Sequence, residues 1–156
     1  MTDAERLVRA LSPVERAARD LPWAKQRPWR GTTHVWVEGA LPVVDLHDLG
    51  RRQAHRAVRI AAETAGVLDA GAVAVVTGRG RRSVGPGVLH AEAREVLADF
   101  CAEHGGYFRP AGPGRWVLVV DADRAPAAAT GRLGWGCWFL VVAFATAALL
   151  ALWRAF

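Results

Sequence analysis

The sequence predicts an α/β domain, and two observations carry the prediction. Between residues 43 and 121, short β-rich runs alternate with longer segments of helical periodicity. One run, AVAVVTG at residues 72–78, is continuously apolar, as in a strand that is buried on both faces. We therefore predict a two-layer α/β sandwich with a mixed sheet in the order β-α-β-α-β-β. A helical arm precedes this domain and one transmembrane helix follows it.

Residues 1–41 are expected to form a helix and an extended arm. In residues 3–20 the apolar positions recur at helical spacing among alternating charges, and Ser12 and Pro13 interrupt or restart the helix. Residues 21–42 contain three prolines, two glycines and three tryptophans, which is typical of an extended linker with a short strand at 35–37. Trp23, Trp29 and Trp36 could stack on bases, but we favour the interpretation that they pin the arm to the domain.

Residues 42–121 should form the domain itself. A strand at 43–46 is followed by a helix at 50–68, in which Ala54, Val58, Ala61 and Ala65 make one apolar stripe. After the strand at 72–78, a second helix is expected at about 88–104. Residues 105–121 supply two strands joined by a turn of proline and glycine, plausible antiparallel neighbours.

The C-terminal part suggests a tether at 122–132 and a membrane span at 133–153. The span has 21 consecutive uncharged residues, enough to cross a hydrocarbon core of roughly 30 Å. Tryptophans lie at both of its ends, as in an interfacial belt. The chain lacks the apolar core of a secretory signal. We therefore expect a single-pass, tail-anchored membrane protein whose N-terminal domain faces the cytoplasm, with the lipid bilayer as a partner of residues 133–153. A row of Ala143, Ala147 and Ala151 could pack helix on helix, but such rows are common by chance.

Charge and cysteine usage narrow the function. The chain has 20 basic and 15 acidic residues, a net charge of +5 and a pI near 10.5. This favours a nucleic acid or an anionic membrane as partner, although nucleotide bias in the coding sequence could also produce the arginine excess. Cys101 and Cys137 have no neighbours at metal-ligand spacing, so we infer neither a zinc site nor a disulfide framework.

Chemistry-bearing residues follow the first strand of the domain. Asp45 and His47 are two residues apart in an extended segment, so their side chains point the same way. The crossover through the helix at 50–68 makes the strands at 43–46 and 72–78 parallel. Their carboxyl ends share one edge, which is where open α/β sheets bind ligands.

A basic, glycine-containing loop follows the second strand. Thr77, Gly78, Arg79, Gly80, Arg81 and Arg82 form this loop, and Arg51 and Arg52 begin the helix beside it. Glycine permits close approach of the backbone to a ligand, and arginines neutralise phosphate charge. Read alone, each part has a structural explanation: a cap, a tight turn, a solvated helix face. His55, His90 and His104 are assigned to structure. Together at one edge, the parts favour a functional site.

The motifs resemble those of the small MutS-related (Smr) domain family. The resemblance covers about residues 42–121 and is carried by Asp45-Leu46-His47-Asp48, by Thr77-Gly78-Arg79-Gly80, and by the closing segment YFRPAGPGRWVLVV. It implies an α/β sandwich that binds nucleic acid and, in several members, nicks DNA or cleaves RNA with the help of a metal. Asp45 and His47 would then be the catalytic or metal-proximal pair, and the Thr77 loop would contact phosphate. Asp48 stands where the family usually has glycine, and Gln53 where it often has glutamate.

The sequence therefore predicts a membrane-tethered Smr-type domain that binds DNA or RNA, with metal-assisted endonuclease activity using Mg²⁺ or Mn²⁺ as the further expectation. The alternative is a non-catalytic adaptor that brings nucleic acid or ribosomes to the membrane. The sequence does not identify the metal or the oligomeric state.

Overall fold

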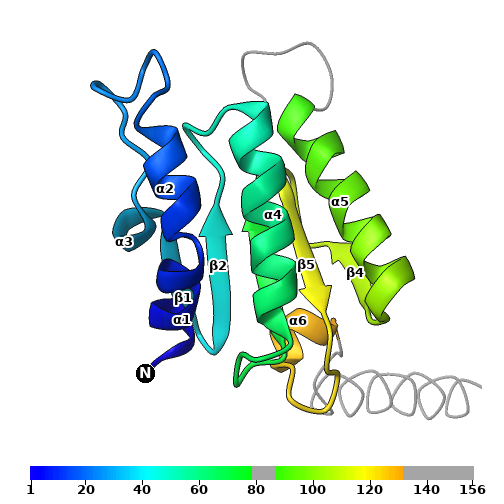
Figure 1. The fold of residues 1–156 in the computed structure, drawn as a ribbon. Helices are drawn as coiled ribbons and strands as arrows, with labels where there is room; N and C mark the ends of the chain where they lie inside the picture. The colour runs from blue at the N-terminus through cyan, green and yellow to red at the C-terminus, as the bar shows by residue number, and fades with distance from the viewer. Residues whose placement is uncertain (79–86, 132–156) are drawn as a thin grey trace, which may run out of the picture.

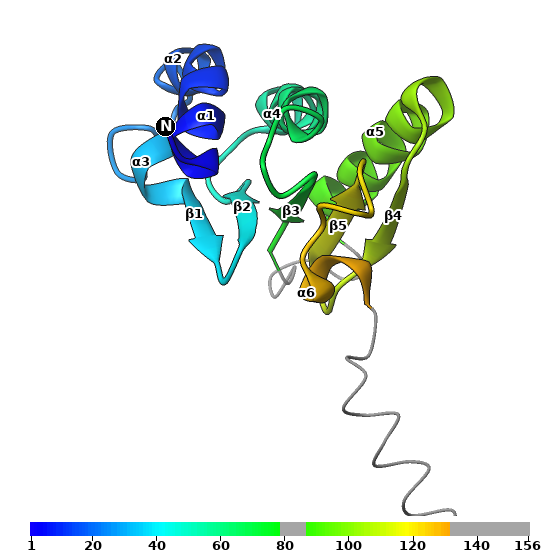
Figure 2. The same ribbon diagram turned by 90° about the horizontal axis from the view of Figure 1, so that it is seen from below.

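The computed structural model describes residues 1–78 and 87–131. Within these ranges the chain forms a five-stranded sheet with helices on both faces (Figures 1 and 2). The helices are α1 (Asp3–Ala10), α2 (Ser12–Ala18), α3 (Gly31–His34), α4 (Arg51–Ala65), α5 (Val88–His104) and α6 (Ala127–Thr130). The strands are β1 (Val35–Glu38), β2 (Leu41–Asp45), β3 (Ala72–Val76), β4 (Tyr107–Pro110) and β5 (Arg115–Val119).

The sheet is mixed, as the sequence predicts. Its strand order is β1-β2-β3-β5-β4. Strands β2 and β3 are parallel, and every other neighbouring pair is antiparallel. The predicted order from β2 to β5 is confirmed, and the short strand suggested within the arm becomes β1, an edge strand paired with β2.

The helices divide unequally between the two faces. Helices α1, α2, α4 and α5 cover one face, and the short α6 lies against the other (Figure 2). Helix α4 buries the alanine-rich stripe that its periodicity predicts, with Ala54, Val58 and Ala61 almost inaccessible to solvent. Because alanine is small, α4 packs closely on the sheet and on α5. The opposite face is covered in part by Ala129 of α6, which packs with Val117 and Val119 of β5.

The N-terminal helices contribute to the main hydrophobic core. Leu7, Leu11 and Val14 are fully buried in the same cluster as α4 and the sheet. The predicted break is present, because α1 ends at Ala10 and Pro13 occupies the first turn of α2, where a missing N–H costs nothing.

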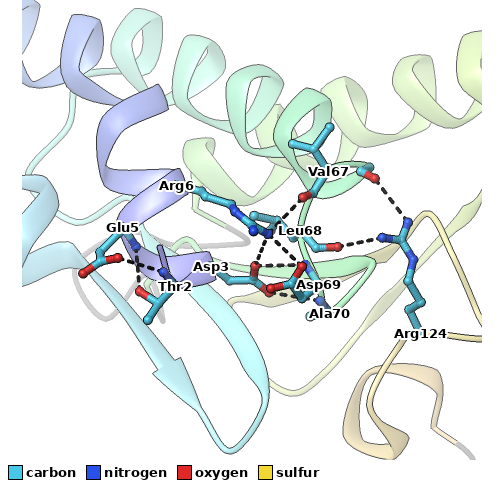
Figure 3. Close-up of polar contacts among 10 residues, drawn as sticks. Thr2, Asp3, Glu5, Arg6, Val67, Leu68, Asp69, Ala70 and Arg124 are labelled. Carbon is cyan, nitrogen blue, oxygen red and sulfur yellow. Dashed lines mark hydrogen bonds and ion pairs between the residues drawn. The ribbon is translucent and has the colours of Figure 1, made fainter.

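Polar contacts hold α1 against the loop that follows α4 (Figure 3). The Asp3 carboxylate accepts the backbone N–H groups of Asp69 and Ala70 at 2.9 and 3.0 Å. Arg6 Nη1 donates to the Val67 carbonyl at 3.2 Å and to Asp69 at 2.9 Å. From the other side, Arg124 donates to the carbonyls of Leu68 and Gly66. The loop between α4 and β3 is thereby tied to segments from both ends of the domain.

Within residues 1–78 and 87–131, no helix is long and apolar enough to span a membrane. The span expected at 133–153 lies outside the described residues.

Candidate nucleic-acid interface

The ends of β2 and β3 bring the two predicted motifs to one edge. Asp45 is the register partner of Val76, and the Leu46 N–H donates to the Val76 carbonyl at 2.8 Å. The residues that follow each strand, His47 on one side and Gly78 on the other, are therefore neighbours. Figure 1 shows that α4 and α5 both begin at this edge.

The closest contact between the motifs is that of His47 with Gly78. Gly78 has φ +78°, and a Cβ atom at this position would lie 2.8 Å from His47 Cε1 and 3.1 Å from its Nδ1. Glycine is thus required both by the left-handed backbone and by the imidazole packed against it. The His47 side chain is 62% exposed, so its ring is both supported and accessible.

The Asp45 carboxylate binds the backbone of the loop that follows it. Its Oδ1 accepts the His47 backbone N–H at 2.8 Å, an Asx-type turn that fixes the start of the loop. The same oxygen lies 3.8 Å from His47 Nδ1, which is an ion-pair distance and too long for a hydrogen bond. The carboxylate therefore lies beside the ring without orienting it through a hydrogen bond.

Asp48 adopts a left-handed backbone conformation, which favours glycine. Its φ is +66°, the only positive value among the described non-glycine residues, and aspartate is one of the few side chains that tolerate it. Its carboxylate lies 3.7 Å from Arg27 Nη1. The added negative charge thus faces a cation of the N-terminal arm.

The Thr77 hydroxyl contacts the imidazole of His90. Its hydroxyl donates to the Gly114 carbonyl at 3.1 Å and lies 3.2 Å from His90 Nδ1. Because the single hydroxyl proton serves Gly114, His90 Nδ1 must be the donor in the second contact. The His90 ring stacks on Trp116 with centroids 4.6 Å apart. His90 therefore supports Thr77 at the edge, in keeping with a structural assignment.

The helix N-termini at this edge have no side-chain caps. Gly50 precedes α4 and Gly87 precedes α5, and neither helix has an acidic residue in its first turn. Unsatisfied N–H groups and the helix dipole make such ends favourable for anions. Helix α4 adds Arg51 and Arg52 here, where cations are intrinsically unfavourable. The two arginines therefore destabilise the start of α4 slightly but add positive charge where an anionic ligand would bind.

A buried carboxylate holds Arg51. Glu92 of α5 is 8% exposed; its Oε2 accepts Arg51 Nε at 2.5 Å and its Oε1 lies 2.7 Å from His55 Nδ1. The hydrogen bond from Arg51, followed by that from His55, lowers the pKa of Glu92. The hydrogen bond to Glu92 in turn raises the pKa of Arg51. The Arg51 side chain remains 70% exposed, so part of its guanidinium can still meet a phosphate.

Arg52 points to a different neighbour. It lines a hollow of about 260 Å³ between α2 and α4, together with Arg56, Gln53 and Asp20. The two predicted arginines of α4 therefore flank the helix on opposite sides, one towards α5 and one towards α2.

Part of the predicted site cannot be located. Arg79, Gly80, Arg81 and Arg82 lie outside the described residues. Among the residues that are described, no group of three or more His, Cys, Asp or Glu side chains could hold a metal. Asp45 offers one carboxylate, and Mg²⁺ commonly uses one or two carboxylates with water and substrate phosphates. The described side chains could hold Mg²⁺ in that way, with water and phosphate as the other ligands, but could not supply a complete set of ligands themselves.

Two features escaped the sequence reasoning. Glu92 falls on the apolar stripe of its helix, between Leu89 and Ala93, and a carboxylate on a buried stripe is a usable signal. The prediction that tryptophans pin the arm to the domain is confirmed for Trp23 and Trp29. The place where they dock, the loop after β2, had no signal in the sequence.

Comparison with known proteins gives one match. Residues 44–115 match the family model of the Smr domain. No curated protein and no solved structure matches the chain. Over these residues the chain is similar to the Smr domain, a family whose name suggests nucleic-acid binding or nuclease function.

Proposed function

We propose, from the Smr match over residues 44–115, that this protein binds nucleic acid at the edge formed by β2 and β3 and cleaves its phosphodiester bonds there. One observation carries the proposal: the His47 ring is packed against Gly78. An accessible imidazole thus lies next to a glycine turn and to two uncapped helix N-termini. This combination suits a phosphate ester better than any other ligand.

In the proposed reaction His47 moves the proton. A histidine ring can act as a general base or acid, so His47 can take a proton from the attacking hydroxyl or give one to the leaving oxygen. Asp45 Oδ1 lies 3.8 Å from His47 Nδ1, so a negative charge faces the ring during the proton transfer. The helix N-termini and Arg51 offset charge on the phosphate. Mg²⁺ or Mn²⁺, bound with Asp45 as a ligand, would supply further neutralisation of that charge.

A second candidate is a non-catalytic adaptor that binds nucleic acid or ribosomes. It is favoured by the geometry of Asp45 in the described structure: its carboxylate accepts no hydrogen bond from the His47 ring, which lies 3.8 Å away, and accepts the His47 backbone N–H instead. Binding would then depend on the arginines and fall steeply with salt, without any product.

We also propose that residues 133–153 anchor the protein in a membrane, with the domain on the cytoplasmic side. The support is the sequence alone: 21 uncharged residues with tryptophans at both ends. Carbonate extraction of membranes from cells that make the full chain tests this, and recovery of the chain in the supernatant would contradict it.

The central experiment measures cleavage by the full chain in detergent. Labelled single- and double-stranded DNA and RNA are incubated with and without Mg²⁺ or Mn²⁺, beside His47→Ala and a control, His104→Ala. His104 stacks on Phe100 at the far end of α5. Cleavage that His47→Ala loses and His104→Ala keeps supports the nuclease. Binding without product supports the adaptor, and no binding refutes both.

A further inference from the structure

Two tryptophans of the N-terminal arm are hydrogen-bonded to the loop that carries His47. Two indole N–H groups donate to backbone carbonyls of this loop: Trp29 to Asp45 at 2.7 Å and Trp23 to Asp48 at 2.8 Å. Both tryptophans precede the segment that matches the Smr family. The residues on either side of His47 are therefore held by a segment of the chain that lies outside that match.

The two tryptophans differ in burial, and the difference suggests different roles. Trp29 is 2% exposed and belongs to the hydrophobic core, so its role is structural. Trp23 is 37% exposed, although its indole N–H is already satisfied. One edge of the Trp23 ring is thus fixed to the backbone while much of its surface remains open to solvent.

Three cations lie close to Trp23 in the sequence. Residues 21–30 contain Lys25, Arg27 and Arg30 and no acidic residue, and all three side chains are exposed. Arg27 lies near the Asp48 carboxylate, which places positive charge at the site itself. Figure 1 shows the arm at the same edge as the turn before α4.

An exposed aromatic ring among cations is the arrangement with which proteins bind single strands. Cations follow the phosphates while bases stack on the ring. In a duplex the base faces are covered by their neighbours, so only an unpaired base can offer its face to the ring. A ring that is already fixed loses little entropy on binding.

We propose that Trp23 is a stacking platform for an unpaired base next to the phosphate held at His47 and Gly78, so that the preferred ligand is a single-stranded nucleic acid. The inference rests on the proposed function, since it requires that nucleic acid bind at this edge. It adds the substrate class and a specificity-determining residue in the arm.

The test compares single strands with a duplex. The full chain in detergent is titrated with labelled oligo(dT) and oligo(U) of about 12 nucleotides and with a duplex of the same length. The variants are Trp23→Ala, Trp23→Phe and the matched control Trp36→Ala, which removes a tryptophan of similar exposure, 39%, from β1. Trp23→Ala should weaken single-strand binding by about 5- to 150-fold, because stacking contributes about 1–3 kcal/mol per base. Trp23→Phe should retain most of the affinity, and Trp36→Ala all of it.

A second measurement uses the wild-type protein, so that it does not depend on the folding of a variant. Photocrosslinking to an oligonucleotide that carries bromouracil should label the peptide that contains Trp23, and the DNA and RNA forms of the probe distinguish the two sugars. Label only on other peptides would overturn the inference. So would Trp23→Ala binding that equals wild type, or that falls equally for single strand and duplex. A wild-type chain that binds no nucleic acid would overturn the proposed function as well.

Discussion

Two residues at the proposed site, Gly78 and Asp48, have a left-handed backbone, which is strained for most side chains. Gly78 has φ +78° and pays no steric cost. Asp48 has φ +66° and keeps a side chain, which faces Arg27. The sequence predicted a functional role for Gly78 and singled out Asp48 as a departure from the family pattern. The left-handed conformation of Asp48 is one that glycine adopts without strain.

Replacing Gly78 should disturb His47 beyond the cost of the backbone. Gly78→Ala places a Cβ 2.8 Å from His47 Cε1, whereas Gly39→Ala at φ +63° meets no atom within 4 Å. Both variants should lose about 1–2 kcal/mol of unfolding free energy from the left-handed conformation. Only Gly78→Ala should shift the imidazole NMR signals of His47 and reduce cleavage or binding. Equal behaviour of the two variants would contradict the contact.

The strain at Asp48 can be isolated by two substitutions. Asp48→Gly and Asp48→Ala both remove the carboxylate, so the loss of the Arg27 contact cancels in their comparison. Asp48→Ala should be less stable than Asp48→Gly by about 1–2 kcal/mol, because alanine at positive φ crowds its carbonyl oxygen. Urea denaturation measures the difference, and equal midpoints would argue against a left-handed residue 48.

At the scale of elements, α4 and α5 are joined by a charge network that the sequence does not reveal. Glu92 binds Arg51 and His55 across the helix interface. It is one of two buried polar or charged residues among those described, the other being Thr77. Because it holds Arg51 at the start of α4, it couples helix packing to the charge at the edge.

The network predicts a defined dependence of stability on pH. The pKa of Glu92 is lower in the folded protein than its ordinary value of 4.5, so the unfolded chain binds more protons in that range. The stabilisation is present above about pH 4.5 and is lost as the pH falls through the folded pKa. Glu92→Gln should therefore cost about 1–3 kcal/mol at pH 7.

The difference between Glu92→Gln and wild type should shrink as the pH falls through the lowered pKa of Glu92. Glu95→Gln, on the exposed side of the same helix, serves as the control and should change stability by less than about 0.5 kcal/mol. Denaturation curves across pH check both, and a deficit for Glu92→Gln that stays constant with pH would show that folding does not lower the pKa of Glu92.

At the scale of the whole molecule, helices α1 and α2 contribute to the hydrophobic core although they precede the segment that matches the Smr family. Leu7 is 0% exposed and packs in the same cluster as Val58 and Leu97. The contacts of Asp3 and Arg6 with the loop after α4 tie the same helix to the domain (Figure 3). The domain therefore needs its first helices to complete one face of the sheet.

Truncation of Leu7 tests this dependence. Leu7→Ala should lower the unfolding free energy by about 2–5 kcal/mol, the usual cost of a core leucine. Val67→Ala, at a position 68% exposed, should change it by no more than about 0.5 kcal/mol. A small effect of Leu7→Ala on a single unfolding transition would mean that the helical arm is not part of the cooperative unit.

The sequence by itself determined the alternation of strands and helices, the parallel pairing of β2 and β3, and the meeting of His47 with Gly78. These follow from hydrophobic periodicity and from the handedness of the crossover, which are local properties. Only the tertiary structure decided that Glu92 holds Arg51, that Arg52 turns towards α2, and that Trp23 and Trp29 grip the loop around His47. Such contacts join residues far apart in the chain, and they depend on the distances and angles at which helices and arm pack, which no local pattern encodes.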